Sequence, residues 1–221
     1  MALAAGSEAG GSAASAPIGI VACGLGNTAS IQRMFEAVDC DAEIIVSPSD
    51  IDRCGKLVLP GVGAFDAGMQ LLADGGWVEP LNQAALDRKM PVLGICLGMQ
   101  LLCRGSEEGV LPGLGWIDAD VRILDTGGDP KLKLPHMGWS VTEPARDSAL
   151  LLDNGEEKRF YYVHKYRVLC DRPENVLATA KYGESFVSAV QRDNIYGVQF
   201  HPEKSHRFGK ELLGRFGRLP C

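Results

Sequence analysis

The chain has 221 residues, of which 46% are hydrophobic and 23% charged, and this composition predicts an ordinary globular protein with a sizeable core. The formal net charge of −6 gives no support to a nucleic-acid or membrane-surface partner. The longest nearly apolar run, from Pro91 to Cys103, is too short and too interrupted by glycine to cross a bilayer. Seven cysteines without a CxxC pair argue against a zinc site and favour free thiols in a reducing, cytoplasmic compartment.

The beginning of the chain differs from the rest. The stretch MALAAGSEAGGSAASAP consists mostly of small residues and lacks the basic and apolar segments of a signal peptide. We therefore interpret residues 1–17 as a flexible tail and residues 18–221 as one domain.

Beyond the tail, short apolar runs alternate with helical patterns. Strands are expected at 18–23, 42–47, 56–61 and 91–96, helices at 27–39 and 97–104, and helical patterns over 65–88. Such alternation is typical of a parallel, doubly wound sheet with helices on its faces.

The second half of the chain carries closely spaced strand-like segments joined by polar turns. They lie at 115–124, 158–170, 175–183, 185–193 and 194–200, and a helix is expected at 205–217. We predict an α/β fold: an open, mostly parallel sheet flanked by helices, with added antiparallel strands in the C-terminal half.

The stretch GICLG places Cys96 between two glycines, at the end of an expected strand and the start of an expected helix. This G-x-C-x-G pattern is the thiol counterpart of the nucleophile elbow of hydrolases. Glycines let the backbone turn sharply there. The start of the helix favours a thiolate, and the Leu97 N–H points to where an oxyanion would form. Cys96 is therefore the candidate nucleophile.

A nucleophilic cysteine needs a base, and the stretch FHPE offers one. His201 directly follows an apolar strand, so it is expected at the same edge of the sheet as Cys96. Glu203, two residues on, is placed to hold the imidazole in the required tautomer. The sequence thus predicts a Cys96–His201–Glu203 triad.

GICLGMQLL and FHPE together resemble the class I glutamine amidotransferases of the Cys-His-Glu type, which have a flavodoxin-like fold. Three further stretches, LPGVGAFDAGM, LPHMGWS and YYVHKYR, narrow the resemblance to the glutaminase-subunit family of imidazole glycerol phosphate synthase. The similarity runs from about residue 18 to residue 216. PHMGW is its most specific piece.

The resemblance implies a role for each matching position. Cys96 would attack the carboxamide of glutamine, His201 would shuttle the protons, and Glu203 would orient His201. The remaining site positions would serve the oxyanion or the substrate. The resemblance implies an oxyanion hole from Val62, Gly63 and Leu97, and glutamine contacts from Gln100, His164 and Lys165.

The resemblance also implies a partner. Glutaminases of this family form a heterodimer with a (β/α)8 cyclase, which receives the ammonia and makes imidazole glycerol phosphate and AICAR in histidine biosynthesis. No cofactor, metal, nucleic acid or membrane is implied. The positions that match the cyclase interface are Asn27, Met137, Trp139, Tyr161 and Lys204.

Three positions depart from the family pattern, and two other functions stay open. Cys23 stands where tyrosine or valine is common. Ser140 stands where asparagine is usual, and Lys165 where serine or threonine is usual. The charge of Lys165 near the glutamine pocket leaves open a catalytically weak or silent scaffold that only binds the cyclase. A class I glutaminase of another pathway is the second alternative, and PHMGW argues against it.

A dinucleotide site is rejected. GLG at residues 24–26 follows a strand and opens a helix, but G-x-G-x-x-G would need glycine where Ala29 stands.

Overall fold

The computed structural model describes residues 16–220, and almost all of the expected tail, residues 1–15, lies outside the described residues. Within the described part, eleven strands join into one sheet, in the order β2-β1-β3-β4-β11-β10-β9-β6-β7, while β8 pairs with β5 and β10. No helix in residues 16–220 is long and apolar enough to cross a membrane.

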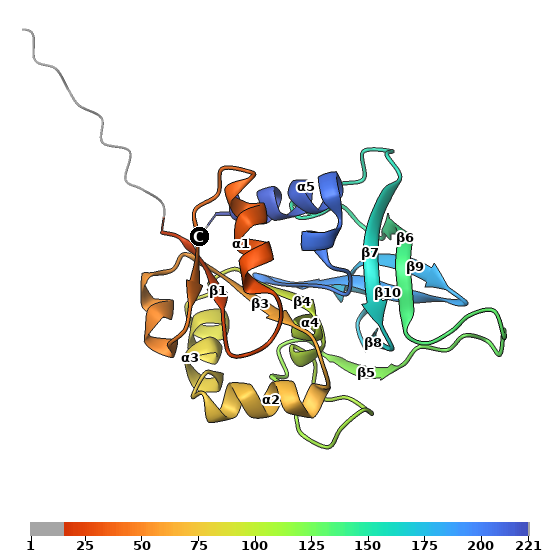
Figure 1. Cartoon of the computed structure of the whole chain (residues 1–221), viewed down its shortest axis with the longest axis horizontal. Coiled ribbons are helices and arrows are strands. Elements are labelled where there is room, and N and C mark those ends of the chain that lie inside the picture. The colour runs from red at the N-terminus through yellow and green to blue at the C-terminus, as the bar shows by residue number, and fades with distance from the viewer. Residues whose placement is uncertain (1–15, 221) are drawn as a thin grey trace, which may run out of the picture.

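The first half of the chain forms the parallel part of the sheet (Figure 1). Its strands are β1 (Ile18–Val21), β2 (Ala42–Ile45), β3 (Lys56–Gly61) and β4 (Val92–Cys96). The C-terminal strand β11 (Ile195–Val198) joins them in parallel with β4. All five were expected from their apolar runs.

Helices cover both faces of this parallel part. α1 (Thr28–Glu36) packs against α5 (His206–Gly217) on one face, and α2 (Phe65–Asp74) packs against α4 (Leu97–Leu101) on the other (Figure 1). Because successive side chains along a strand point to opposite faces of the sheet, β3 contributes side chains to the cores on both faces. Leu57 and Leu59 belong to the core under α2 and α4, and Val58 to the core under α1 and α5.

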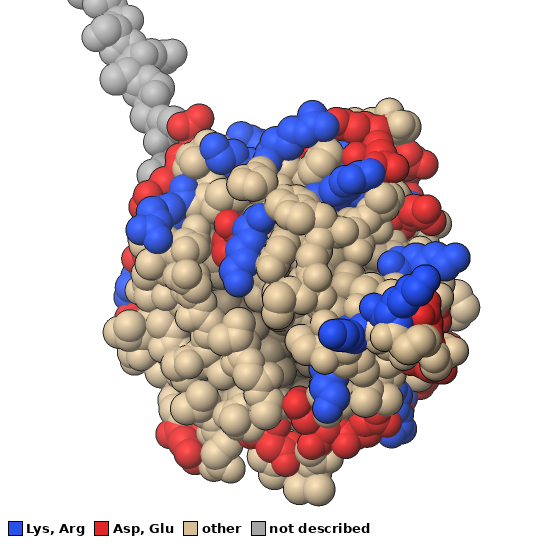
Figure 2. Space-filling view, turned by 45° about the vertical axis from the view of Figure 1, so that its right-hand side comes forward, with Lys and Arg blue, Asp and Glu red and all other residues tan. Residues whose placement is uncertain are grey.

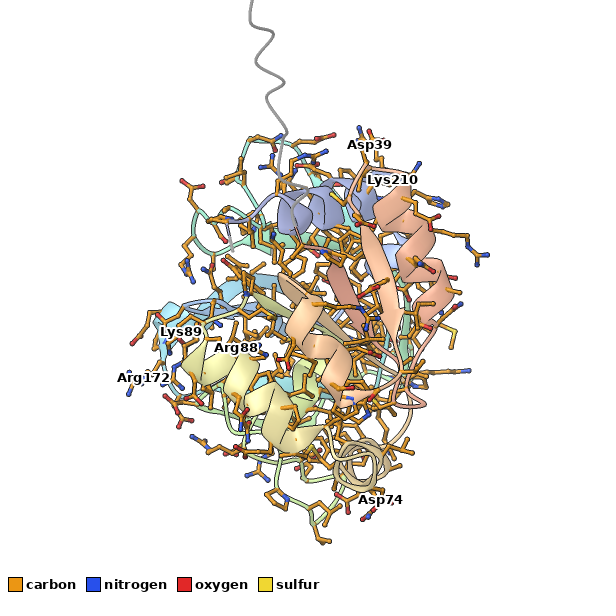
Figure 3. The ribbon with its side chains drawn as sticks, turned by 90° about the vertical axis from the view of Figure 1, so that its left-hand side faces the viewer. Asp39, Asp74, Arg88, Lys89, Arg172 and Lys210 are labelled. Carbon is orange, nitrogen blue, oxygen red and sulfur yellow. The ribbon has the colours of Figure 1, made fainter. Side chains whose placement is uncertain are left out.

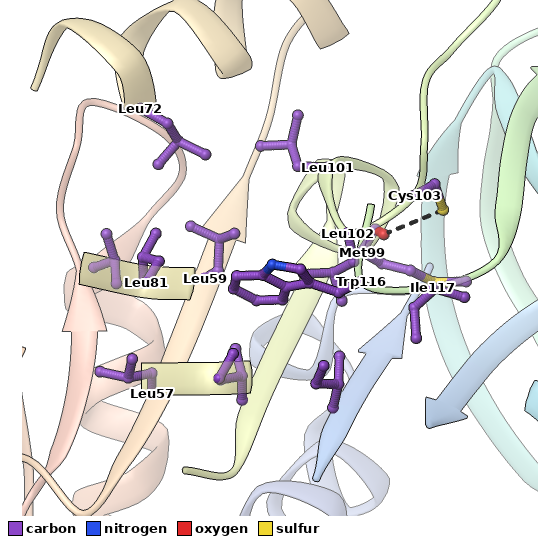
Figure 4. Packing of buried hydrophobic residues seen from close by; sticks show 14 of the residues in the cluster. Leu57, Leu59, Leu72, Leu81, Met99, Leu101, Leu102, Cys103, Trp116 and Ile117 are labelled. Atoms are coloured by element: carbon purple, nitrogen blue, oxygen red, sulfur yellow. Dashed lines mark hydrogen bonds between the residues drawn. The ribbon is translucent and has the colours of Figure 1, made fainter. Parts of the chain in front are cut away.

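The core under α2 contains many leucines and two tryptophans, Trp77 and Trp116, of which Trp116 is labelled in Figure 4. Trp116 is buried, and its indole N–H donates to Oδ1 of Asn82, 2.8 Å away, so its polar edge is satisfied. Cys103 lies in the same core and donates its thiol to the carbonyl of Met99. Burial raises the pKa of the Cys103 thiol far above its ordinary value. Cys103 is thus a packing residue.

Most charged side chains lie on the outside of these layers, and Lys56 and Lys158 are buried exceptions. In Figure 3 the labelled residues Asp39, Asp74, Arg88, Arg172 and Lys210 extend away from the sheet.

The helical patterns expected over 65–88 form two helices and a further turn. α2 ends at Asp74, Gly76 takes a positive φ of 69°, and the chain continues as α3 (Val78–Asn82) and the π-helical turn η2 (Gln83–Asp87). The helix expected over 97–104 is shorter than predicted. α4 ends at Leu101, because the next N–H groups bond to the carbonyls three residues back and tighten the last turn.

The second half builds the antiparallel strands β5 (Ala119–Ile123), β9 (Val176–Tyr182) and β10 (Glu184–Arg192), all near their expected positions. One expected strand, 158–170, is two strands, β7 (Lys158–His164) and β8 (Tyr166–Cys170), broken at Lys165. The sequence patterns missed one long strand, β6 (His136–Pro144), which pairs with β7. The predicted open α/β sheet with antiparallel strands added in the C-terminal half is confirmed.

Candidate active site

Cys96 is the last residue of β4, and its backbone makes a sharp turn. Its φ of 55° and ψ of −110° lie in a region that non-glycine residues rarely occupy, and α4 begins at the next residue. The neighbouring glycines make this turn possible. A Cβ on Gly98 would overlap the carbonyl oxygen of Leu59, and one on Gly94 would lie 2.7 Å from the carbonyl oxygen of Gly98. The strand–turn–helix geometry of a nucleophile elbow is present.

His201 and Glu203 reach the same edge of the sheet. β11 runs parallel to β4, with Val198 beside Ile95, so the chain leaves β11 next to Cys96. The short helix η4 (Pro202–Lys204) then folds Glu203 back. Nδ1 of His201 lies 2.8 Å from Oε1 of Glu203, and both side chains are buried. Because a carboxylate only accepts, Nδ1 carries a proton, and Nε2 is the atom left for Cys96.

The charge of His201 follows from its neighbours. Burial lowers its pKa, but hydrogen bonds to Cys96 and Glu203, and the charges of these two groups, outweigh burial and raise the pKa to about 9. His201 is therefore an imidazolium at neutral pH. A cation beside a cysteine sulfur stabilises the thiolate, which is the nucleophilic form. The site thus places the candidate nucleophile beside a group that can give a proton.

A cavity of about 250 Å³ opens beside Cys96. The structure brings together around it the triad residues Cys96 and His201 and every residue predicted for the oxyanion hole or for glutamine. These are Val62, Gly63, Leu97, Gln100, His164 and Lys165. Glu108, Pro135, Val163, Tyr166 and Lys204 complete the lining.

The segment expected to supply the oxyanion hole lies directly beside the nucleophile. Gly61 pairs with Cys96 across β3 and β4, so residues 62 and 63 leave the sheet at the cavity. Val62 is 52% exposed. Gly63 has a φ of 110°, and a Cβ there would meet nothing within 4 Å. Glycine is thus required at position 63 for its backbone conformation and not for lack of space.

Gln100 faces a second glutamine that the sequence analysis missed. Nε2 of Gln100 donates to Oε1 of Gln199 at 3.0 Å and to the carbonyl of Tyr166 at 3.3 Å. Gln199 is fully buried, and its Nε2 donates to Sγ of Cys96 at 3.7 Å. Both N–H groups of Gln100 are therefore used within the protein, which leaves its carbonyl oxygen to accept from a ligand. The sequence signal that could have identified Gln199 is its position as the one polar residue in the otherwise apolar stretch GVQF.

Glu108 is a further site residue without a sequence prediction. It reaches the cavity from the loop after α4, and its Oε2 accepts the Phe65 N–H at 3.0 Å, at the start of α2. The same loop is held by Asp66, whose carboxylate accepts the N–H groups of Val110 and Leu111 at 2.9 and 3.0 Å. A fixed carboxylate in the lining suits a ligand with an ammonium group.

His164 lies in the wall opposite the elbow, where β7 ends. Its ring is buried and contacts the ring of His136, which the sequence analysis did not assign. Burial lowers the pKa of both, to about 4 for His136 and about 3 for His164, so both are neutral at pH 7. Lys165, next in the chain, is exposed, and its ammonium lies 5.4 Å from the centre of the Tyr166 ring.

The residues predicted for the cyclase interface gather near the same edge. Met137 and Trp139 of β6 are 63% and 45% exposed. Trp139 packs edge-on against Tyr161 and stacks on His206, and Lys204 lies over the Tyr161 ring, 5.9 Å from its centre.

The fifth predicted interface residue, Asn27, is exposed and caps α1 by accepting the Ser30 N–H at 3.2 Å. It belongs to the same region because α1 packs against η4, which contains Lys204.

The charges on one face of the molecule are mixed. Figure 2 shows a broad uncharged area, hollowed near its centre, with Lys and Arg spaced above and to the right, and Asp and Glu along the lower edge and at the upper right. On this face the basic side chains do not merge into one strongly positive patch of the kind that binds a phosphate backbone.

An α/β sheet with a cysteine elbow and a histidine held by glutamate defines a triad-type cysteine amidotransferase or hydrolase. The glutamine amidotransferase class-I family matches residues 20–218. Among solved structures, PurLQS from Thermotoga maritima shares this fold, with a TM-score of 0.69 and 17% identity over 90% of this chain and 97% of that one.

Curated relatives show to which subfamily of the class-I glutamine amidotransferases the chain belongs. The imidazole glycerol phosphate synthase subunit HisH 2 of Pseudomonas aeruginosa is 45% identical over 90% of this chain and 98% of its own length. The protein of the same name from Methanococcus maripaludis is 46% identical, with the same coverage of each chain. The chain belongs to the class-I glutamine amidotransferases and, within them, to the HisH subunit family of imidazole glycerol phosphate synthase.

Proposed function

We propose that this chain hydrolyses glutamine to glutamate and ammonia and supplies the ammonia to a (β/α)8 cyclase subunit, which makes imidazole glycerol phosphate and AICAR in histidine biosynthesis. The observation that carries the proposal is the buried Cys96–His201–Glu203 arrangement, open to a cavity lined by Gln100 and Glu108. We further propose that residues 18–221 form one domain and act in the cytoplasm.

The reaction follows from the atoms at the elbow. The Cys96 thiolate attacks the carboxamide carbon of glutamine, and the oxygen of the tetrahedral intermediate is held by the Leu97 N–H and an N–H at Val62 or Gly63. The His201 imidazolium gives its proton to the departing amine, and the C–N bond breaks to leave a thioester and ammonia. A water then attacks the thioester while His201 takes one of its protons, and glutamate leaves with Cys96 restored. Glu203 keeps the Nδ1–H of His201 in place through both steps.

The amino-acid end of glutamine has matching groups in the cavity. The carboxylate of Glu108 faces its ammonium group, and the backbone at His164 and Lys165 contacts its carboxylate. The carbonyl oxygen of Gln100 accepts from the substrate, because its N–H groups already donate to Gln199 and Tyr166.

The cyclase docks on the region of Met137, Trp139, Tyr161, Lys204 and Asn27, giving a heterodimer. Exposed aromatic and methionine side chains are enriched at protein interfaces, and this region adjoins the cavity through Lys204. Docking there covers the cavity mouth, so that ammonia passes to the cyclase before it is protonated in water.

The test is glutamine hydrolysis by the purified chain, alone and with a cyclase subunit of imidazole glycerol phosphate synthase and its ribonucleotide ligand. The proposal predicts strong activation by the loaded partner. Hydrolysis that ignores the partner would contradict the proposed pathway. Absence of hydrolysis in both conditions would contradict the proposed enzymatic activity and indicate a scaffold subunit that only binds the cyclase.

A further inference from the structure

A chain of hydrogen bonds begins on β6 and ends at the nucleophile. Oγ of Ser140 lies 2.9 Å from Nε2 of His136, and Nδ1 of His136 lies 2.9 Å from Nε2 of His164. Nδ1 of His164 lies 2.8 Å from the carbonyl oxygen of Tyr166. Neither Ser140 nor His136 touches the cavity itself.

The direction of every bond in this chain is determined. A carbonyl oxygen only accepts, so Nδ1 of His164 carries the proton and, in the neutral ring, Nε2 is bare. The bare Nε2 must accept, so Nδ1 of His136 donates to it. The Nε2 of His136 is then bare in turn and accepts from the Ser140 hydroxyl. Both rings are neutral because burial lowers the pKa of each, to about 4 and about 3.

The chain continues from Tyr166 to the sulfur. The Tyr166 carbonyl also accepts from Nε2 of Gln100, which donates its second proton to Gln199. Gln199 donates to Sγ of Cys96. The turn at Lys165, between β7 and β8, is therefore held by His164 from one side and joined to the elbow by Gln100 from the other.

The ring of His136 has little freedom to turn. It is stacked between Tyr182, at 4.1 Å between ring centres, and Tyr162, at 5.1 Å. A ring fixed in plane and bonded at both nitrogens is a rigid donor for His164.

We propose that His136 and Ser140 are positioning residues for glutamine hydrolysis: through hydrogen bonds they fix the Nδ1–H tautomer of His164 and so hold the His164–Tyr166 turn that forms the substrate wall. This inference rests on the proposed function. Without the His136 donor, His164 gains access to the Nε2–H tautomer, its Nδ1 becomes an acceptor facing the Tyr166 carbonyl, and the turn loosens. The loss falls on glutamine binding, because Cys96 stays at the end of β4, His201 at the start of η4 and Glu203 within it.

The main test compares three variants in the complex with a cyclase subunit. His136→Leu removes the donor, His136→Asn keeps an N–H near the Nδ1 position, and Ser140→Ala removes only the bond to Nε2. We expect KM for glutamine to rise roughly tenfold in His136→Leu, with kcat changed less than about threefold, as for one lost buried hydrogen bond. His136→Asn is expected to restore KM to within about threefold of wild type, and Ser140→Ala to lie between the two.

Tyr162→Phe is the matched control. Tyr162 is buried on β7, stacks on His136 and shares a 2.6 Å hydrogen bond with Thr142, but is outside the chain of bonds that leads to Cys96. The Tyr162→Phe variant should have a KM for glutamine within about twofold of wild type. It loses a buried hydrogen bond between β6 and β7 but leaves the hydrogen bonds of His164 unchanged. An equal rise of KM in Tyr162→Phe, or an unchanged KM in His136→Leu, would overturn the inference.

A spectroscopic measurement tests the tautomer without turnover. Nitrogen-15 NMR of the labelled chain should show His164 as the Nδ1–H tautomer in the wild type and as a mixture in His136→Leu. The Nε2–H tautomer in the wild type would refute the inference even if glutamine is hydrolysed. A wild type that shows the expected tautomer but hydrolyses no glutamine in the complex would instead refute the proposed function, and with it the role in hydrolysis.

Discussion

The two sides of the cavity are held in different ways. On the elbow side, the position of Cys96 is set by backbone packing, since β3, β4 and α4 approach so closely that only glycine fits at 94 and 98. On the opposite side, the turn at Lys165 is held by side-chain hydrogen bonds from His164 and Gln100, together with one backbone bond from the Leu124 N–H to the Lys165 carbonyl at 3.0 Å.

This difference has a physical consequence. Backbone overlap cannot be relieved by a small adjustment, so changes on the elbow side should act in an all-or-none way. A lost side-chain hydrogen bond costs a limited amount and can be partly replaced, so changes in the wall should be graded. The candidate nucleophile is thus held by the more rigid side, and we expect substrate binding to depend on the more adjustable one.

The largest effect is expected from Cys96→Ala, which removes the reacting atom. Glutamine-dependent turnover should fall by at least about a thousandfold, as for loss of other catalytic nucleophiles. Turnover of the cyclase complex with added ammonium salt should persist, because the partner needs only ammonia. Loss of the ammonium-dependent activity as well would mean that Cys96 has a structural role.

Gly98→Ala tests whether the backbone sets the elbow. Its Cβ would overlap the Leu59 carbonyl, so α4 must move off β3, and the free energy of unfolding should fall by about 3 kcal/mol or more, measured by urea denaturation. Gly105→Ala is the matched control, because the nearest atom to its Cβ is 4.0 Å away, and it should change stability by less than about 0.5 kcal/mol. If the two variants had similar free energies of unfolding, close backbone packing would not be what sets the position of the elbow.

Glu203→Gln should have an intermediate effect. Gln still accepts from Nδ1 of His201, but the negative charge that helps raise the pKa of His201 to about 9 is lost. We expect kcat to fall roughly 10- to 100-fold, and the alkaline limb of the pH profile to move to lower pH.

The His201–Glu203 pair also makes the stability of the fold depend on pH. Since the pKa of His201 is raised in the folded state, the pair stabilises the wild type fully below about pH 6.5, and this contribution disappears as the pH rises through about 9. The difference in urea midpoint between wild type and Glu203→Gln should therefore shrink from pH 6 to pH 9.5. A constant difference would contradict a charged His201.

Lys165→Ser should have the smallest effect. The lysine is exposed and its ammonium lies over the Tyr166 ring, so it is not needed to hold the turn. We expect KM for glutamine to change less than about threefold, the scale of an exposed cation–π contact. A much larger change would mean that the ammonium itself contacts the substrate, and that the wall is not set by its hydrogen bonds alone.

The sequence predicted the elbow side better than the wall. Apolar runs, helical periods and the glycines around Cys96 are local signals, and they located the parallel strands and the start of α4. His201 was placed near Cys96 because strand ends meet at one edge of a parallel sheet.

The wall depends on which residues face each other across antiparallel strands, and this register has no local signal. β6 and the pairing of His136 with His164 both depend on it. The break of the expected strand at Lys165 was missed for a related reason, since one of the hydrogen bonds that hold the turn comes from Gln100, in a distant segment.

The most direct test of the central claim, that Cys96 is the nucleophile of a glutamine-specific site, is covalent labelling with the glutamine analogue 6-diazo-5-oxo-L-norleucine, followed by mass mapping. We expect one modified residue, Cys96, with labelling slowed by glutamine and faster when the cyclase is bound. Modification spread over several cysteines, or labelling that glutamine does not slow, would contradict it.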